Sequence, residues 1–325
     1  MAEQIRWGIL STANIGRSRV IPAIHASNNG IVSAVASRDL ARAQDFAQAN
    51  DIPTAYGTYE ALIADPNIDA IYIPTPNSEH AEWSLKCADA GKPTLCEKPL
   101  ASDGNEAQRM VDRFSDAGVT FAEAFMYRFH PRTVRVKQMV DDGAIGEIKA
   151  INAAFTFTVR NEANVRLNKS LAGGSLMDVG CYCVNVLRHM TGHEPYRVEA
   201  IAVMGDESGV DESLTGILAF SGGVLGHFDC GLRTYRAHMY DIRGTNGRIR
   251  VNDAFVPDAD QTTTIDYWHG DDYEEITIPP ANHYQLMVED FADALLNDRA
   301  PRFDPQDGVE NMRVIDRLLS SVMRS

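Results

Sequence analysis

Two short stretches near the N-terminus carry residue types that could hold a phosphate group. The first, WGILSTANIG over residues 7–16, leads from an apolar run through a turn into a helical pattern. In a G-x-G-x-x-G loop at such a place, glycines make the turn and let the backbone approach a pyrophosphate. Here Ser11 and Ala13 occupy the first two glycine positions and only Gly16 matches. Both replacements are small, so backbone N–H groups at the helix N-terminus could still bind phosphate. A plain strand-to-helix turn is the alternative. The candidate cofactor-binding residues of this loop are Ser11, Thr12, Ala13, Asn14 and Ile15.

The second stretch is Ser37-Arg38, which follows the next strand-like run. An NAD site usually has Asp or Glu about 20 residues past the loop, bonded to the ribose hydroxyls, whereas a 2′-phosphate needs a cation. A hydroxyl next to a guanidinium suits a phosphate dianion. The pair therefore predicts a preference for NADP. The alternative is that Asp39 caps the next helix and Arg38 is merely solvated.

The elements around these stretches alternate between strand and helix patterns. Short apolar runs at 5–10, 31–36, 69–73, 93–96 and 119–122 predict strands, and residues 14–27, 39–50, 58–64, 78–90 and 103–117 predict helices. This β-α-β-α order indicates a parallel sheet with helices on both faces, which binds ligands at the carboxyl ends of its strands.

After about residue 147 the pattern changes to longer alternating segments separated by turns, such as IKAINAAFTFTV, RVEAIAVM, LTGILAF, VLGHFDCG, HMYDIRG and TTTIDYW. These predict a mostly antiparallel sheet. Helical patterns interrupt it at about 174–191 and close the chain at about 283–296 and 307–323. The predicted fold class is α/β, with a Rossmann-like domain over residues 1–123 followed by an α+β domain with an open, mostly antiparallel sheet over residues 124–325. The last helices could pack back on the first domain.

Composition limits the partners. A chain of 325 residues with 44% hydrophobic and 23% charged residues is typical of a folded globular protein of two domains. The net charge of −15 repels nucleic acid and anionic lipid. No uninterrupted apolar run approaches membrane-spanning length, and the first residues show no signal-peptide pattern. We therefore expect a cytoplasmic protein that binds neither nucleic acid nor membrane.

The cysteines and histidines do not indicate a disulfide framework or a metal site. Five scattered cysteines, an odd number, suit a reducing compartment. Cys181 and Cys183 have no second Cys/His pair at zinc-like spacing, so buried thiols are the simpler interpretation. The histidines at 25, 189, 193, 227 and 269 also lack ligand spacing. No metal is expected.

Two further motifs connect the chain to a known family. TPNSEH at 75–80 follows the strand pattern at 69–73, and CEKPL at 96–100 follows the one at 93–96. Together with the first loop and the alternating second half, they resemble the Gfo/Idh/MocA oxidoreductases over essentially the whole chain. The resemblance implies that both motifs border the nicotinamide pocket. The matching residues are Thr75, Pro76, Asn77, His80, Glu97 and Lys98.

Two longer stretches indicate a subgroup. AEAFMYRFHP at 122–131 and GGSLMDVGCYCVNVLRH at 173–189 look like the xylose dehydrogenases, trans-dihydrodiol dehydrogenases and glucose-fructose oxidoreductases of that family. Many family members carry His four residues after the Asp of the second motif. This chain has Tyr182 after Asp178, as that subgroup does.

The resemblance gives these residues catalytic work that their chemistry allows. Spacing of four on a helix places Asp178 and Tyr182 on one face. A phenol is a poor base at neutral pH, but a nearby ammonium favours the phenolate. We predict that Tyr182 exchanges the hydroxyl proton of the substrate, that Lys98 lowers the pKa of Tyr182 and binds the same oxygen, and that Asp178 orients the substrate or Lys98. The alternative is that Tyr182 fills a gap between helix and sheet.

Several other residues are candidates by analogy alone. Arg128 is expected at the nicotinamide or the substrate, with an ion pair that holds its loop as the alternative. The candidate substrate-pocket residues are Met126, Tyr127, Phe155, Arg160 and Arg166, of which the aromatic and apolar ones could simply be core.

The sequence therefore predicts an NADP-dependent oxidoreductase with its active site between the two domains. It would transfer hydride between nicotinamide and an aldopyranose such as D-xylose or D-glucose, giving a lactone. A trans-dihydrodiol dehydrogenase or ketosugar reductase is the second hypothesis, and a non-catalytic dinucleotide sensor is the third. One sheet face left uncovered by helices predicts a homodimer or higher homo-oligomer. The particular sugar or diol and the direction of reaction are not encoded in residue spacing.

Overall fold

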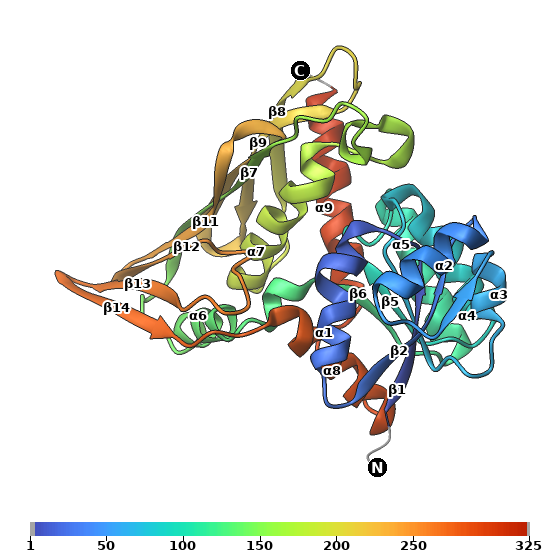
Figure 1. Cartoon of the computed structure of the whole chain (residues 1–325). Coiled ribbons are helices and arrows are strands. Elements are labelled where there is room, and N and C mark those ends of the chain that lie inside the picture. Colours follow the sequence, from blue (N-terminus) through green and yellow to red (C-terminus); the bar gives the residue numbers. More distant parts are fainter. Residues whose placement is uncertain (1–3, 324–325) are drawn as a thin grey trace. The chain divides into compact units, whose positions relative to one another are not determined.

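The computed structural model describes residues 4–323 of the chain (Figure 1), which form two compact units. The first unit contains the residues up to Met126 together with His283–Val309. The second contains Tyr127–Asn282 and the residues from Glu310 onward. The first segment thus ends after residue 126, where the sequence pattern suggested 123.

The first unit is built on a six-stranded parallel sheet in the order β3-β2-β1-β4-β5-β6. The order reverses between β1 and β4, which makes these two strands the topological switch point of the sheet. The strands are β1 Ile5–Leu10, β2 Gly30–Ala36, β3 Thr54–Tyr56, β4 Ala70–Ile73, β5 Thr94–Glu97 and β6 Phe121–Ala124. The helices are η1 Gly16–Val20, α1 Ile21–Ala26, α2 Leu40–Ala49, α3 Tyr59–Ile63, η2 Asn77–Glu79, α4 His80–Asp89, α5 Gly104–Ala117 and α8 His283–Leu296.

Burial and capping explain why these segments fold as they do. Every residue of β4, β5 and β6 is buried, as expected for strands covered on both faces. Side chains cap the helices that follow β2, β3 and β5, since Asp39, Thr58 and Asp103 accept N–H bonds in their first turns. Helix α5 ends at Gly118, whose φ of 63° is left-handed.

Helix α8 belongs to the first unit although it comes late in the sequence. It packs on α1, β1 and β2. The ring of Phe291 lies 5.4 Å from that of Trp7, and the Asn29 side chain donates to the carbonyl of Glu289 at 2.9 Å. A segment more than 250 residues away in sequence therefore completes the core of this unit.

The second unit is built on an eight-stranded sheet in the order β14-β13-β12-β11-β7-β10-β9-β8. All neighbouring strands are antiparallel except β10 and β7. The strands are β7 Ile148–Thr158, β8 Arg197–Met204, β9 Asp211–Phe220, β10 Val224–Gly231, β11 Arg233–Gly244, β12 Gly247–Asn252, β13 Thr263–His269 and β14 Asp272–Ile278. The helices are η3 Met126–Phe129, α6 Pro131–Asp141, η4 Val165–Leu167, η5 Lys169–Leu171, η6 Leu176–Gly180, α7 Cys181–Thr191, η7 Ser221–Gly223 and α9 Gln306–Val322, of which η3 and α9 each have residues in both units.

The two faces of this sheet differ. Helix α7 packs on β7 and β10, and Figure 1 shows it lying along one side of the sheet. On the opposite face the strands nearest β8 alternate between buried and exposed residues. The exposed apolar side chains there are Ile201 (75% exposed), Val203 (67%), Ile217 (55%) and Leu225 (55%). We call these four residues the outer apolar patch.

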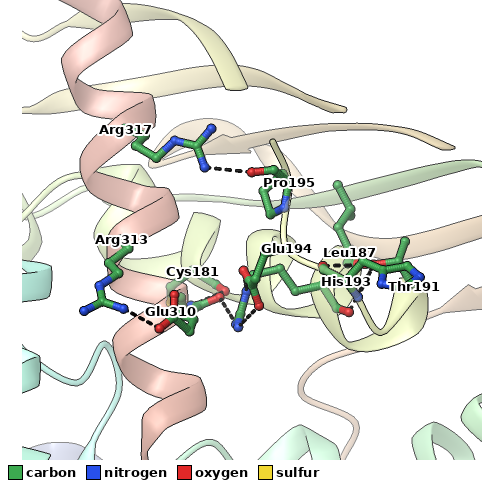
Figure 2. A network of polar contacts seen from close by, with 11 residues as sticks. Cys181, Leu187, Thr191, His193, Glu194, Pro195, Glu310, Arg313 and Arg317 are labelled. Atoms are coloured by element: carbon green, nitrogen blue, oxygen red, sulfur yellow. Dashed lines mark hydrogen bonds and ion pairs between the residues drawn. The ribbon is translucent and has the colours of Figure 1, made fainter. Parts of the chain in front are cut away.

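Polar contacts fix both ends of the connection between α7 and β8. Arg188 donates to both carboxylate oxygens of Glu194, at 2.8 and 2.6 Å. Arg317 of α9 donates to the carbonyl of Pro195 at 2.7 Å (Figure 2) and to that of Tyr196 at 2.9 Å. Arg317 thus satisfies two backbone carbonyls that the loop would otherwise leave to water.

Apolarity of the α7 region reflects burial. The stretch Lys169–Thr191 is long and apolar enough to cross a membrane, but 72% of its most apolar window is buried inside the protein. The buried core helix of a soluble protein can be equally long and apolar, so this stretch is only weak evidence for a membrane span.

The predicted fold class is confirmed, and every strand and helix predicted from the sequence is present within a few residues. The pattern missed β3, α6, β12 and β14. Strand β3 has only three residues, and β14 is an edge strand in which four consecutive exposed residues hide any alternation. All five cysteines are buried free thiols.

Candidate active site

The loop after β1 adopts the backbone geometry that a glycine usually provides. Ser11 has a φ of 150°, which side-chain-bearing residues rarely adopt. Its hydroxyl donates to the carbonyl of Pro74 at 3.3 Å and accepts the N–H of Ala13 at 3.2 Å. These two bonds tie the turn to the segment after β4. Serine therefore makes the turn that the first glycine of the fingerprint would make.

Two helix N-termini beside this loop have no side-chain cap. Neither η1, which follows β1, nor η2, which follows β4, begins with a capping side chain. The three capped helices of this unit follow β2, β3 and β5 instead. The uncapped helix ends thus lie at the switch point of the sheet, where open α/β folds bind ligands and where N–H groups attract anions. This arrangement fits a pyrophosphate on the first loop.

Ser37 and Arg38 lie at the end of β2, the strand beside β1. Ser37 is buried, whereas the side chain of Arg38 is 75% exposed. The carboxylate of Glu79 is 3.4 Å from the guanidinium, and exposed pairs of this kind contribute little. The guanidinium can therefore turn to an incoming anion at small cost.

His80 joins the two family motifs of the first unit. Its side chain is fully buried, with Nδ1 2.9 Å from the carbonyl of Pro99 and Nε2 3.0 Å from that of Thr75. Both ring nitrogens face carbonyl oxygens, so the imidazole braces the segment after β4 against the segment after β5. Desolvation is the main cause that lowers the pKa of His80 to about 4, and Lys98 contributes through its charge. At neutral pH the ring is therefore neutral and only one nitrogen donates.

Thr75 follows β4 and Glu97 ends β5, so both lie beside the two segments that His80 contacts. The Thr75 hydroxyl is buried and has no hydrogen-bond partner among residues 4–323, which is the kind of atom a bound ligand would satisfy. Glu97 accepts a 2.6 Å bond from the hydroxyl of Tyr72, whose pKa burial raises well above its ordinary value. Glu97 also accepts the backbone N–H of Lys98 at 3.3 Å, which fixes the residue that carries the ammonium. Pro76, Asn77 and Lys98 are partly exposed.

In the second unit, one continuous helical segment carries Asp178 and Tyr182. It begins with η6, a single turn of π-helix, and continues as α7. The carboxylate of Asp178 accepts a 2.6 Å bond from Nε of Arg166, and its charge holds the pKa of that arginine above its ordinary value. The structure thus brings together three residues selected from sequence, because Tyr182 also interacts electrostatically with Arg166.

The two glycines before this helix are required by close backbone approach. A Cβ on Gly173 would lie 2.4 Å from the carbonyl oxygen of Arg166, and one on Gly174 would lie 2.2 Å from the Asp211 carboxylate. Asp211 accepts the Ser175 hydroxyl and the Leu176 N–H, both at 2.7 Å, at the start of η6. The glycines therefore let the chain bring Arg166 beside the helix that carries Asp178.

Tyr182 itself is 4% exposed and packs among aromatic rings. The centroid of its ring lies 5.2 Å from Phe155, 5.4 Å from Phe255 and 5.8 Å from Tyr127. Phe155 and Phe255 are stacked at 5.2 Å with an interplanar angle of 12°. We call Tyr127, Phe155, Tyr182 and Phe255 the aromatic cluster. Phe255 was missed at the sequence level, because it stands in an irregular loop and belongs to no motif.

Three candidate residues from the sequence lie outside the contacts described above. Arg160 is exposed, Met126 is buried in the first unit, and Arg128 is 3% exposed in the second. Within residues 4–323, no group of three or more His, Cys, Asp or Glu residues could hold a metal ion.

Two family models match the chain. Residues 5–125 match the model described as the oxidoreductase family, NAD-binding Rossmann fold, and residues 133–250 match the GFO/IDH/MocA C-terminal domain.

Curated relatives cover most of the chain. The D-xylose 1-dehydrogenase (NADP(+)) 2 of Haloferax volcanii is 40% identical over 97% of this chain and 96% of its own length. The trans-1,2-dihydrobenzene-1,2-diol dehydrogenase of Mus musculus is 35% identical over 78% of this chain and 76% of its own.

A solved structure is also similar over the whole chain. It is a tyrosine-to-phenylalanine variant of KijD10, a 3-ketoreductase from Actinomadura kijaniata, in complex with TDP-benzene and NADP. It superposes with a TM-score of 0.93 at 29% identity, over 98% of both chains. A lysine-to-alanine variant of the same reductase has also been solved.

The brace formed by His80 predicts a pH-dependent stability. Its folded pKa of about 4 is below the value of about 6.5 in an unfolded chain, so the unfolded chain binds the proton more tightly. The stability is fully present above pH 6.5 and is lost as pH falls toward 4, by at most about 3 kcal/mol. We expect the stability difference between the wild type and His80→Gln to shrink over that window in chemical denaturation. His25→Gln, at an exposed site, is the control. A difference independent of pH would contradict this role.

Proposed function

The chain belongs to the GFO/IDH/MocA oxidoreductase family, and from that premise we propose that it is an NADP-dependent dehydrogenase of a cyclic sugar. The observation that carries the proposal is the placement of Tyr182, on one helix with Asp178, beside Arg166 and within the aromatic cluster. D-Xylose or a similar aldopyranose is the proposed substrate and a lactone the product, which the similarity to a D-xylose 1-dehydrogenase supports.

The first unit is proposed to hold the dinucleotide. The turn at Ser11 and the uncapped N-terminus of η1 would bind the pyrophosphate, and Ser37 with Arg38 would bind the 2′-phosphate of NADP. The buried Thr75 hydroxyl would gain a partner on the nicotinamide side. NADP in the name of the 40% identical dehydrogenase and in the 3-ketoreductase complex supports the choice of NADP over NAD.

Tyr182 is proposed to move the proton of the reaction. During oxidation the phenolate of Tyr182 accepts the proton of the substrate hydroxyl as a carbon–oxygen double bond forms. The ammonium of Lys98 favours that phenolate and binds the same oxygen. When bound, the nicotinamide supplies the hydride acceptor. Asp178, held by Arg166, orients the substrate by accepting from a neighbouring hydroxyl.

The second candidate is a trans-dihydrodiol dehydrogenase or a ketosugar reductase. The aromatic cluster supports this second candidate, because flat rings would pack against an unsaturated diol as well as against the C–H face of a sugar. The relatives that act on a dihydrodiol or reduce a keto group support the same chemistry in either direction. A non-catalytic dinucleotide sensor is the third candidate function, and such a protein would not need Tyr182.

The outer apolar patch supports self-association of the protein. Ile201 and Ile217 lie on neighbouring strands of the same sheet face, with small residues such as Thr215 between them. Several exposed apolar side chains on one sheet face favour an interface there. We propose a homodimer, or a higher homo-oligomer, formed through this face.

Loss of the Tyr182 hydroxyl tests the catalytic proposal. With D-xylose and NADP, we expect Tyr182→Phe to lower kcat by about 10²–10⁴-fold, because no group remains to accept the proton. NADPH formation at 340 nm would be measured with aldoses and a trans-dihydrodiol. Tyr267→Phe, which removes a hydroxyl bonded to the carbonyl of Ala144, is the matched control. Normal turnover by Tyr182→Phe would reject the role, and tight NADP binding without turnover of any substrate would favour the sensor.

Removal of the Arg38 guanidinium tests cofactor choice. We expect Arg38→Ala to raise the Kd for NADP by about 10-fold or more, since a charge-assisted hydrogen bond is lost, while the Kd for NAD stays the same. Fluorescence titration measures both constants. Arg42→Ala, an exposed arginine on α2, is the control. An unchanged NADP-to-NAD preference in Arg38→Ala would refute the assignment.

Charges on the outer apolar patch test the oligomer. We expect the wild type to have an oligomer mass in light scattering, and Ile201→Lys with Ile217→Lys to shift it toward the monomer, because buried unpaired ammonium groups oppose association. Leu40→Lys, at an exposed leucine of α2, should leave the mass unchanged. A monomer mass for the wild type would end the proposal.

A further inference from the structure

We propose that Arg132 is a positioning residue for Tyr182, acting through the turn Asn252–Ala254 and the ring of Phe255. The inference rests on the proposed function, because it assumes that Tyr182 moves the proton. It concerns Arg132 on α6 and the loop after β12, and both lie outside the sequence motifs described above.

The guanidinium of Arg132 is buried and faces backbone carbonyls. Arg132 is 2% exposed, and its Nη1 donates to the carbonyl of Asn252 at 2.9 Å. Its Nη2 donates to the carbonyl of Asp253 at 2.5 Å and to that of Ala254 at 3.3 Å. Three consecutive carbonyls of one turn are thus bound by one planar group.

The burial of this guanidinium costs free energy, so we infer that the turn depends on the hydrogen bonds that Arg132 donates. Burying a cation away from water is unfavourable, and desolvation lowers the pKa of Arg132 accordingly. Within the described chain, Nε of Arg132 has no hydrogen-bond partner. Within residues 4–323, the hydrogen bonds that this side chain donates therefore all go to the turn.

The turn would not hold its shape from its own sequence. Asp253 has a φ of 47°, in the left-handed region that costs a non-glycine residue about 1 kcal/mol or more. The chain after β12 continues without regular structure until β13 begins at Thr263. Besides Arg132, the second anchor is His238. Its carbonyl accepts the N–H of Ala254 at 2.9 Å, and its Nε2 lies 3.1 Å from the Asp253 carboxylate.

Phe255 comes directly after this turn and is fully buried. Its ring stacks on Phe155 and lies 5.4 Å from both Tyr182 and Tyr127. Because Phe155 also contacts Tyr182, the stacked pair forms a wall against which the phenol rests. The path from the guanidinium to the phenol therefore consists of one turn and one ring.

Small displacements of the phenol matter for the reaction. A shift of about 1 Å in a catalytic group can cost about 10²-fold in rate, even when the cause lies away from the chemistry. If Arg132 is lost, the turn relaxes from its left-handed residue, Phe255 moves, and the wall behind Tyr182 loosens. The ring of Tyr182 then samples orientations in which its hydroxyl misses the substrate.

The chain offers a matched control in Arg317. Arg317 also donates through both Nη atoms to two consecutive backbone carbonyls, that of Pro195 (Figure 2) and that of Tyr196. That connection precedes β8, which is five strands from β12 in the sheet order and thus roughly 24 Å away. Arg317→Met removes the same kind of anchor without touching the aromatic cluster.

The first experiment measures turnover. We expect Arg132→Met and Phe255→Leu each to lower kcat by about 10-fold or more with the Kd for NADP unchanged, and Arg132→Lys to recover part of the loss through a single carbonyl contact. The double variant should be no slower than the slower single variant, because both act on one path. Arg317→Met should keep the wild-type kcat. Losses that multiply in the double variant, or an equal loss in Arg317→Met, would overturn the proposal.

The second experiment does not depend on activity. In protein labelled at tyrosine Cζ, the NMR signal of Tyr182 is the one absent from Tyr182→Phe. We expect that signal to shift in Arg132→Met and Phe255→Leu and to stay in place in Arg317→Met, since ring currents report the position of Phe255. A signal unmoved in Arg132→Met would refute positioning. A shifted signal combined with normal turnover by Tyr182→Phe would leave the positioning intact and reject the proposed function instead.

Discussion

The bridge that His80 makes between two backbone carbonyls is the interaction on which the first unit's site depends. Each of the loops after β4 and β5 is short, and neither could fix its own backbone. One buried ring, 3.0 Å from Thr75 and 2.9 Å from Pro99, sets the distance between them. Lys98 immediately precedes Pro99, so the backbone at Lys98 lies next to a segment that the ring contacts. His80 was selected at the sequence level as a cofactor contact, and its geometry indicates that it acts by bracing the loops.

In the second unit, charged groups and aromatic packing hold the candidate site residues in place. Its functional helix starts at a buried carboxylate, Asp211, which binds the hydroxyl of Ser175 and the N–H of Leu176. The helix then carries Asp178 to Arg166 and Tyr182 to the aromatic cluster. In both units a polar group is buried at some cost and is satisfied by the backbone or by an ion pair. The cost is acceptable because each such group fixes a loop that hydrophobic packing alone would leave mobile.

The sequence predicted the parts of this protein that are local, and it missed the parts that depend on distant contacts. The loop at Ser11, the pair Ser37-Arg38 and the spacing of Asp178 and Tyr182 could all be selected, because each lies next to a recognisable strand or helix. Phe255 could not be selected. Its place against Tyr182 depends on a left-handed residue at 253 and on an arginine more than 100 residues earlier in the chain. No periodicity records such a contact. Helix α6 was also missed, because its sequence has no strongly apolar pattern, and so was strand β12, although residues 248–252 alternate between polar and apolar types.

The charges around Tyr182 explain why the proposed base is assigned a further cation. Arg166 lies close enough to Tyr182 to interact with it, but its charge is already compensated by Asp178 at 2.6 Å. The pair is close to neutral overall, and the rings of the aromatic cluster offer a phenolate little solvation. The proposed base therefore calls on a second cation, and Lys98, in the family motif just after β5, is the residue proposed for it.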